Sequence, residues 1–131
     1  MIGKNNPFNL RYSSGNRWIG QIGCTRGFAD FSTLEYGIRA ACILIMVSYR
    51  KKNVVTIQEI IERFAPSMEN DTEAYVRFVC NKLGCFPFDI PRKIDFPRLL
   101  KAMSQFEGCE VPCSSIVSVI ESFNIKPYKC Q

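Results

Sequence analysis

From residue 32 to residue 123 the chain is a succession of short amphipathic segments, and most of them open with a helix start signal. Ser32 and Glu35 have the spacing of a capping box, and the apolar pattern that follows them runs to about Tyr49. Thr56 and Glu59 have the same spacing before a second pattern. A chain with these signals is expected to fold mainly into helices.

The apolar residues of these segments recur at helical spacing, which predicts the faces that pack into a core. In the first helix they are Leu34, Ile38, Ala41, Cys42, Ile45 and Met46, and in the second, which ends near Phe64, they are Ile57, Ile60 and Ile61. Three more helices are expected: Asn70 to Leu83, closed by Gly84; Asp95 to about Phe106, with Pro97 in the first turn; and about Ser114 to Phe123. Asn70 and Asp95 are the expected N-caps.

Residues 1–31 have a different character. They are rich in Asn, Ser and Gly, and "RWIGQIG" and "GFADF" are short β-like pieces. The length of 131 residues is that of one domain. The sequence therefore predicts a single domain over residues 1–131, mainly α (α+β), with an extended and partly β segment at 1–31 and a compact helical part at 32–131.

The charge is positive and unevenly distributed. The chain has 17 basic and 12 acidic residues, a net charge of +5, and residues 1–52 alone contain 8 basic and 2 acidic residues. Such a patch suits an anionic polymer, either nucleic acid, lipid head groups or acidic cell-wall glycan, and it also suits a solvated face that keeps the protein soluble.

Residue usage excludes several kinds of chemistry. The absence of histidine excludes Ser-His and Cys-His nucleophilic catalysis and zinc sites that need imidazole. Seven cysteines are an odd number without a Cys-x-x-Cys pair, which suits a reducing cytoplasm, with one or two disulfides after release. Cys42 and Cys80 fall in apolar helical patterns and are expected to be buried. We expect no metal and no cofactor.

The amino end shows no cleavable signal peptide, and the apolar run at 40–47, "AACILIMV", is too short to span a bilayer. We therefore expect synthesis in the cytoplasm without a membrane span. A target in the periplasm or cell wall would require another delivery route.

The remaining catalytic residue types are carboxylates, tyrosines, lysines and cysteines, and Glu107 is the first candidate among the acids. It follows Phe106 at the end of an apolar helix and precedes a glycine-containing loop that could open a cleft. Cleavage of a glycosidic bond needs one acid that protonates the leaving oxygen, with a pKa raised by apolar neighbours. The alternative is an ordinary exposed residue in the last turn of a helix.

The other candidate site residues each have a functional and a structural interpretation. Glu69 precedes a helix start, where a carboxylate is electrostatically favoured and often structural. Asp30 points either into a cleft or into water, and Trp18, the only tryptophan, either stacks against a sugar ring or fills the core. Tyr75 either packs in the core or holds a reacting group through its hydroxyl.

Four segments resemble a family of small proteins encoded in phages, prophages and gut-bacterial genomes, commonly labelled virion structural proteins. They are "NNPFNLRYSSGNRWIGQIG", "GFADFSTLEYGIRAACILI", "TIQEIIERFAPSMENDTEAYVRFVCNKLG" and "LLKAMSQFEG". Together they cover nearly the whole chain. This resemblance implies a phage-related protein and specifies little chemistry.

A second resemblance concerns mechanism. The order Asn-x-Phe-Asn-Leu-Arg at 6–11, then Trp18 and Gly20, then "FADF" and a helix is similar to bacterial glucosaminidases of the lysozyme superfamily. In those enzymes the helix that ends in the catalytic glutamate precedes this segment, whereas "LLKAMSQFEG" lies near the carboxyl end here. The resemblance implies a circularly permuted lysozyme-like domain with Glu107 as general acid.

This resemblance implies a glycosidase or lytic transglycosylase that acts on peptidoglycan. Glu107 and Glu69 would be catalytic, with Asp30 or the substrate's own acetamido group as alternatives to Glu69. The substrate-binding set would be Asn9, Arg11, Trp18, Asp30 and Tyr75. The expected partners are peptidoglycan glycan strands and phage tail or secretion-machine proteins, and the protein would act in the periplasm or cell wall after delivery, or in the virion.

Two other function classes compete with this one. A non-catalytic virion or injection-machine component that binds wall glycan would need the same groove but would leave Glu107 fully exposed and pointing away from Trp18. Nucleic-acid binding rests on net charge alone and predicts salt-dependent association with DNA. Since no recognisable binding motif is present, we expect no nucleic-acid partner.

Overall fold

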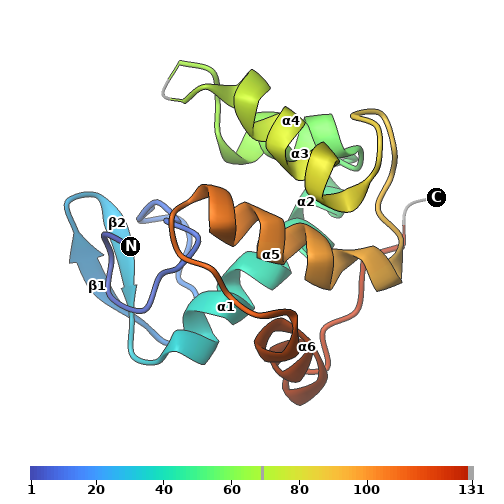
Figure 1. Ribbon diagram of the computed structural model, residues 1–131. Helices are drawn as coiled ribbons and strands as arrows, with labels where there is room; N and C mark the ends of the chain where they lie inside the picture. Colours follow the sequence, from blue (N-terminus) through green and yellow to red (C-terminus); the bar gives the residue numbers. More distant parts are fainter. Residues whose placement is uncertain (69, 130–131) are drawn as a thin grey trace.

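The computed structural model describes residues 1–68 and 70–129 and is mainly α, with a small antiparallel sheet near the amino end (Figure 1). The elements in chain order are β1 (Gln21–Thr25), β2 (Phe28–Phe31), α1 (Leu34–Ile43), the π-helical η1 (Leu44–Ser48), α2 (Tyr49–Lys51), α3 (Ile57–Phe64), α4 (Thr72–Leu83), the 3-10 turn η2 (Lys93–Asp95), α5 (Phe96–Phe106) and α6 (Cys113–Ser122). The predicted fold class, mainly α with a small strand part near the amino end, is confirmed.

The two strands form a hairpin. β1 pairs antiparallel with β2, and the turn residues Arg26 and Gly27 both have positive φ, 53° and 87°. Two positive φ values match the right-handed twist of a tight hairpin. Of the two β-like pieces predicted, "GFADF" contains β2. The other, "RWIGQIG", overlaps β1 only from Gln21 onward, because the strand begins after the tryptophan.

Asn6 ties the amino-terminal segment to the sheet. Its side chain is fully buried, and its Nδ2 donates to the carbonyls of Leu10 and Ala29, each at 2.9 Å. Its Oδ1 accepts from the Leu10 amide at 2.9 Å. Buried polar atoms are costly unless they are bonded, so this amide and the backbone groups that it meets stabilise one another. The turn around Asn9 is thereby fixed against β2.

The first predicted helix is present as α1, η1 and α2 in succession, from Leu34 to Lys51. Its predicted capping box is wrong: the N-cap is Thr33, whose Oγ1 accepts from the Tyr36 amide at 3.3 Å. Leu34 was predicted to face the core but is 40% exposed, because it occupies the first position after that cap.

The π-helical segment η1 interrupts this helix in its second half. A π turn releases backbone groups from the regular ladder, and here the Met46 carbonyl accepts from the Tyr128 amide at 2.9 Å. The carbonyl of Tyr128 in turn accepts from Arg50 Nε at 2.6 Å. The carboxyl-terminal segment is thus held against the helix.

The remaining helices follow their predicted signals with two differences. The Thr56–Glu59 capping box of α3 is confirmed, as is Gly84, left-handed, at the end of α4. The N-cap of α4 is Asp71 and not Asn70, because the Asp71 carboxylate accepts from the amide of Ala74. Asp95 does not cap α5 with its side chain; it accepts from the Arg92 amide and closes η2 instead.

Buried apolar side chains from the amino-terminal segment, β2 and every helix form the core. α5 contributes Leu99, Leu100 and Met103, all fully buried, and it lies between α4 and α6 in Figure 1. Cys42 and Cys80 are buried as predicted, and burial raises the pKa of each thiol to about 12. The six cysteines of the described chain are free thiols. Within residues 1–68 and 70–129 no helix has the length and apolarity needed to cross a membrane.

Candidate active site

A cleft of about 790 Å³ separates the amino-terminal segment from the helical part around α2 and α3. The amino-terminal side contributes Asn9, Leu10, Arg11, Ser13, Asn16, Trp18 and Phe28. The helical side contributes Leu44, Ser48, Tyr49, Lys51, Lys52, Arg63, Phe64, Ala65, Pro66 and Asn70, and Glu107 completes the lining. Four predicted site residues, Asn9, Arg11, Trp18 and Glu107, therefore share one cleft.

Glu107 is positioned by the way α5 ends. Gly108 has φ 88°, its amide donates to the Gln105 carbonyl at 3.0 Å, and the Cys109 amide donates to the Ser104 carbonyl at 2.9 Å. This pair of hydrogen bonds is the Schellman motif, which needs a residue without Cβ strain after the helix. The glycine after Glu107 thus ends the helix at the point where the carboxylate meets the cleft.

The amide of Asn9 holds the Glu107 carboxylate. Asn9 Nδ2 donates to Glu107 Oε1 at 3.0 Å and lies 3.4 Å from the Glu107 carbonyl oxygen. Asn9 has φ 51°, a left-handed conformation that Asn adopts more readily than most residues. Both side chains are partly buried. The carboxylate is therefore oriented by a neighbour and is not a freely rotating group on the surface.

Tyr75 packs against the end of α5 from the protein interior. It is 1% exposed, its hydroxyl donates to the Met103 carbonyl at 3.3 Å, and its ring stacks on Phe106 with centroids 4.1 Å apart. Burial raises the pKa of the Tyr75 hydroxyl, and the nearby charge of Glu107 raises that pKa further. Tyr75 stays protonated, and it is not among the described residues that line the cleft.

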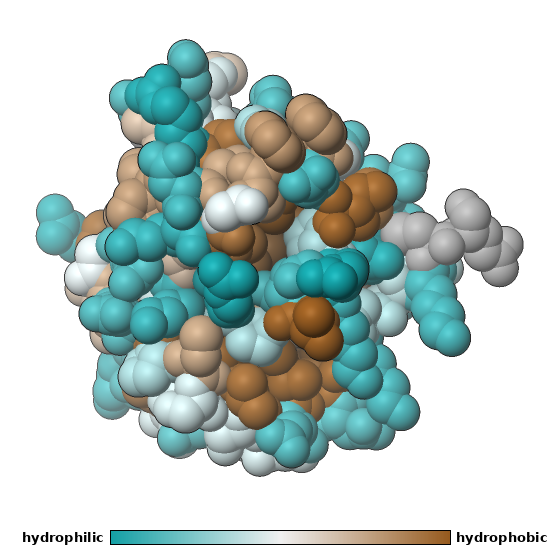
Figure 2. All heavy atoms as spheres, turned by 45° about the vertical axis from the view of Figure 1, so that its right-hand side comes forward, coloured by the Kyte–Doolittle hydropathy of each residue, from teal (hydrophilic) through white to brown (hydrophobic). Residues whose placement is uncertain are grey.

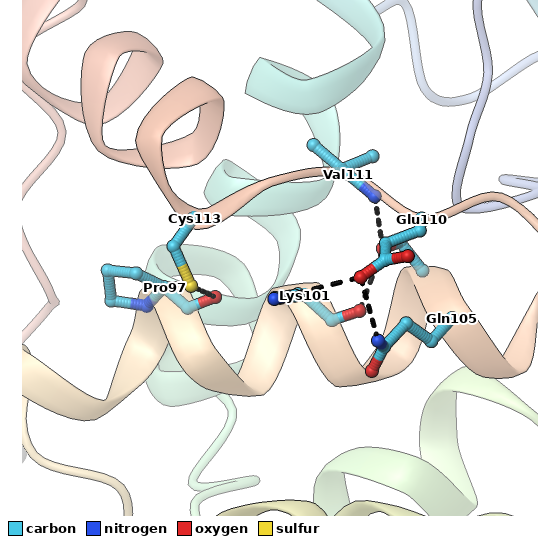
Figure 3. A network of polar contacts seen from close by, with 7 residues as sticks. Pro97, Lys101, Gln105, Glu110, Val111 and Cys113 are labelled. Atoms are coloured by element: carbon cyan, nitrogen blue, oxygen red, sulfur yellow. Dashed lines mark hydrogen bonds and ion pairs between the residues drawn. The ribbon is translucent and has the colours of Figure 1, made fainter.

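The loop after Glu107 is fastened along α5 (Figure 3). Ser104, fully buried, accepts from the Val111 amide at 2.9 Å, and Glu110 accepts from Gln105 Nε2 at 3.0 Å. Lys101 Nζ lies 3.7 Å from the same Glu110 oxygen. The backbone on both sides of Glu107 is thus fixed, which keeps the carboxylate in one place.

Trp18 and the cations shape the rest of the cleft. Trp18 packs partly against the core while it also lines the cleft, and its stacking against a sugar ring stays a prediction. Arg11 lies over the ring of Phe28 at 4.7 Å. Glu107 is the only acid among the described lining residues, against the cations Arg11, Lys51, Lys52 and Arg63.

The two candidates for a second carboxylate have different outcomes. Asp30 is engaged outside the cleft, where its carboxylate accepts from the Lys4 amide at 2.6 Å and from Thr25 Oγ1 at 2.8 Å. Glu69 lies outside the described residues, so its catalytic role stays a prediction.

The sequence as a whole is similar to that of a phage protein. Protein P5 of Pseudoalteromonas phage PM2 is 36% identical over 117 residues, which cover 82% of this chain and 70% of the relative. The chain belongs to the phage protein P5 family. No protein-family model matches the chain. The resemblance to phage-encoded proteins is thereby confirmed, and the relative's name specifies no activity.

In this member of the protein P5 family, the site includes residues that sequence reasoning missed. Lys51, Lys52 and Arg63 line the cleft from α2, the turn after it and α3. They have no motif of their own, and the basic count of residues 1–52 was the single signal that included the first two. The described residues of this P5 relative contain no group of three or more His, Cys, Asp or Glu side chains that could hold a metal ion.

Proposed function

We propose that this protein cleaves peptidoglycan glycan strands, with Glu107 as the general acid. The observation that supports the proposal best is the 3.0 Å hydrogen bond between Asn9 and Glu107 inside a cleft that also contains Trp18. A permuted lysozyme-like domain requires this juxtaposition, because the Asn-Phe-Asn segment must adjoin the end of the glutamate helix. The two residues are 98 positions apart in the chain.

The proposed reaction begins with protonated Glu107. Its carboxyl proton goes to the glycosidic oxygen as the bond from that oxygen to the anomeric carbon breaks, and the bonding electron pair leaves with the oxygen. The resulting Glu107 carboxylate then takes a proton from the incoming hydroxyl, which adds to the anomeric carbon. Asn9 holds the carboxyl group in place through both steps.

The positive charge that develops on the sugar needs a stabilising partner. Glu107 is the only acid in the described lining, so this partner would be either Glu69, which lies outside the described residues, or the substrate's own acetamido group. Amino sugars of the cell wall carry this group. The attacking hydroxyl is either water, which gives a hydrolase, or a hydroxyl of the same sugar, which gives a transglycosylase.

The cations of the cleft suit an anionic wall polymer, so their removal is expected to affect cleavage of a charged substrate more than that of a neutral one. We expect Lys52→Glu/Arg63→Glu to lower kcat/KM on peptidoglycan about tenfold and to leave cleavage of neutral amino-sugar oligomers nearly unchanged. Release of soluble fragments from each substrate measures this. Arg17→Glu/Arg26→Glu changes the net charge equally at exposed residues outside the cleft lining and serves as the control. An equal loss on both substrates would contradict charge recognition.

Trp18 is the only tryptophan, so its fluorescence reports on the cleft directly. We expect soluble glycan fragments to change the emission of Glu107→Gln protein, which binds without turnover. Trp18→Ala should raise KM about tenfold through loss of stacking area, with a smaller effect on kcat. Emission that stays unchanged at saturating glycan, together with an unaltered KM in Trp18→Ala, would remove Trp18 from the binding site.

The alternative is a non-catalytic virion or injection-machine component that binds wall glycan. Membership of a phage protein family supports this alternative as well as it supports an enzyme. Both functions use the same cleft and fit delivery by a phage particle. Incubation of the pure protein with insoluble peptidoglycan separates them, because the enzyme releases soluble muropeptides and the binding protein only sediments with the wall.

A further inference from the structure

The loop between α4 and α5 exposes a group of large apolar side chains that are not part of the cleft lining. Phe86 is 63% exposed, Phe88 71%, Ile90 55% and Ile94 70%. Figure 2 brings this side of the molecule forward and shows brown apolar side chains at the surface with teal hydrophilic ones between them. We call residues 86–94 the apolar loop. Adjacent exposed residues of this size on a short segment indicate an interaction surface.

The apolar loop is held in place by hydrogen bonds. The Asp89 carboxylate accepts from the Phe86 amide at 2.9 Å, and the rings of Phe86 and Phe88 stack with centroids 5.4 Å apart. The carbonyls of Pro87 and Asp89 accept from the amides of Gln58 and Ile57 at the start of α3, each at 2.9 Å. The loop therefore presents its apolar side chains outward from a fixed backbone.

A cationic groove of about 300 Å³ adjoins the apolar loop. Arg92 and Lys93 of the loop line it together with Lys126 and Lys129 of the carboxyl-terminal segment, and all four are exposed. The described lining of this groove contains no carboxylate. Asp95 lies beside the groove and pairs with Arg92 at 3.2 Å. The net charge of the groove stays positive because the other cations outnumber this one carboxylate.

We propose that the apolar loop and the cationic groove form one surface that binds an anionic phospholipid bilayer. Aromatic and aliphatic side chains enter the interface between head groups and acyl chains, and neighbouring Lys and Arg side chains attract anionic head groups. Association with a second copy would bring the same cations against one another, so charge favours the lipid surface. This inference does not depend on the proposed glycan cleavage.

Sedimentation of the full chain with vesicles tests the proposal. We expect binding to vesicles of phosphatidylcholine with phosphatidylglycerol, weakening as salt is added, and little binding to phosphatidylcholine alone. Phe86→Ser/Phe88→Ser should lower the affinity at least about tenfold by removing inserted apolar area. Lys93→Glu/Lys126→Glu should lower it about tenfold as well.

Matched variants elsewhere on the molecule serve as controls. Ile19→Ser/Ile22→Ser removes two exposed apolar side chains near the sheet, and Arg17→Glu/Arg26→Glu makes the same charge change as the groove variant. We expect both to bind vesicles like the unaltered protein. Absence of binding to anionic vesicles, or equal losses in the control and loop variants, would overturn the proposal. So would a dimer in light scattering that Phe86→Ser/Phe88→Ser dissociates, because the loop would then be a protein interface.

Discussion

Glu107→Gln is expected to lower the release of fragments from peptidoglycan about a thousandfold, because glutamine has no proton of suitable acidity to give to the leaving oxygen. The substitution keeps the size of the side chain and an oxygen that accepts from Asn9 Nδ2. The thermal midpoint and the circular dichroism spectrum should therefore stay close to those of the unaltered protein. Fragment release from purified peptidoglycan, followed over time, measures the change.

Glu110→Gln is the matched control for this prediction. Glu110 lies three residues further on, is exposed, and contacts Lys101 and Gln105 on the outer side of α5 (Figure 3). We expect its loss to change the rate less than twofold, since surface ion pairs contribute little. If both variants released fragments at the rate of the unaltered protein, Glu107 would have no part in the chemistry.

Asn6→Ala is expected to destabilise the fold by about 3 kcal/mol, the largest stability effect that we predict for a polar residue. The substitution removes three hydrogen bonds and leaves the amide of Leu10 and the carbonyls of Leu10 and Ala29 without this partner. Thermal unfolding followed by circular dichroism should show a midpoint lower by about 10 °C. Because Asn6 fixes the turn around Asn9, activity should fall even below the unfolding midpoint.

Asn70→Ala tests whether the effect is specific to the buried clamp. Asn70 is exposed and makes one long hydrogen bond, from its Nδ2 to the Pro66 carbonyl at 3.3 Å. We expect a change within about 0.5 kcal/mol, as for most surface substitutions. An Asn6→Ala midpoint as high as that of Asn70→Ala would show that the amino-terminal segment is held by its apolar contacts alone.

Local signals in the sequence predicted the helices well, with errors of one residue where two capping residues are adjacent. Ser32 and Thr33 are both good N-caps, as are Asn70 and Asp71, and the choice depends on which side chain reaches the free amides. Position within the turn also decided the exposure of Leu34. Propensity ranks such neighbours too closely to separate them.

The arrangement of the candidate site depends on contacts that no local pattern contains. The end of α5 at Glu107 followed from an apolar repeat and a glycine, whereas the hydrogen bond from Asn9 joins residues 98 positions apart. Tyr75 lies against the last turns of α5 because α4 packs on α5. The resemblance to a permuted lysozyme-like domain implied that Asn9 and Glu107 share one cleft, without the hydrogen bond between them, and it left the role of Tyr75 undecided.

The cations of the cleft were the least predictable part. Lys52 follows the end of α2, and Arg63 belongs to the last turn of α3, so they come together only when these elements pack. Charge counting placed an excess in residues 1–52 but could not say which residues face one cavity. Such clusters are properties of the tertiary arrangement.

The most direct test of the central claim is mass spectrometry of the products from purified peptidoglycan incubated with the unaltered protein. We predict soluble disaccharide-peptide fragments whose masses show cleavage between amino sugars, with an anhydro or a reducing end that identifies the attacking hydroxyl. Peptidoglycan that remains insoluble, with the protein bound to it, would contradict cleavage and would leave a wall-binding phage protein in its place.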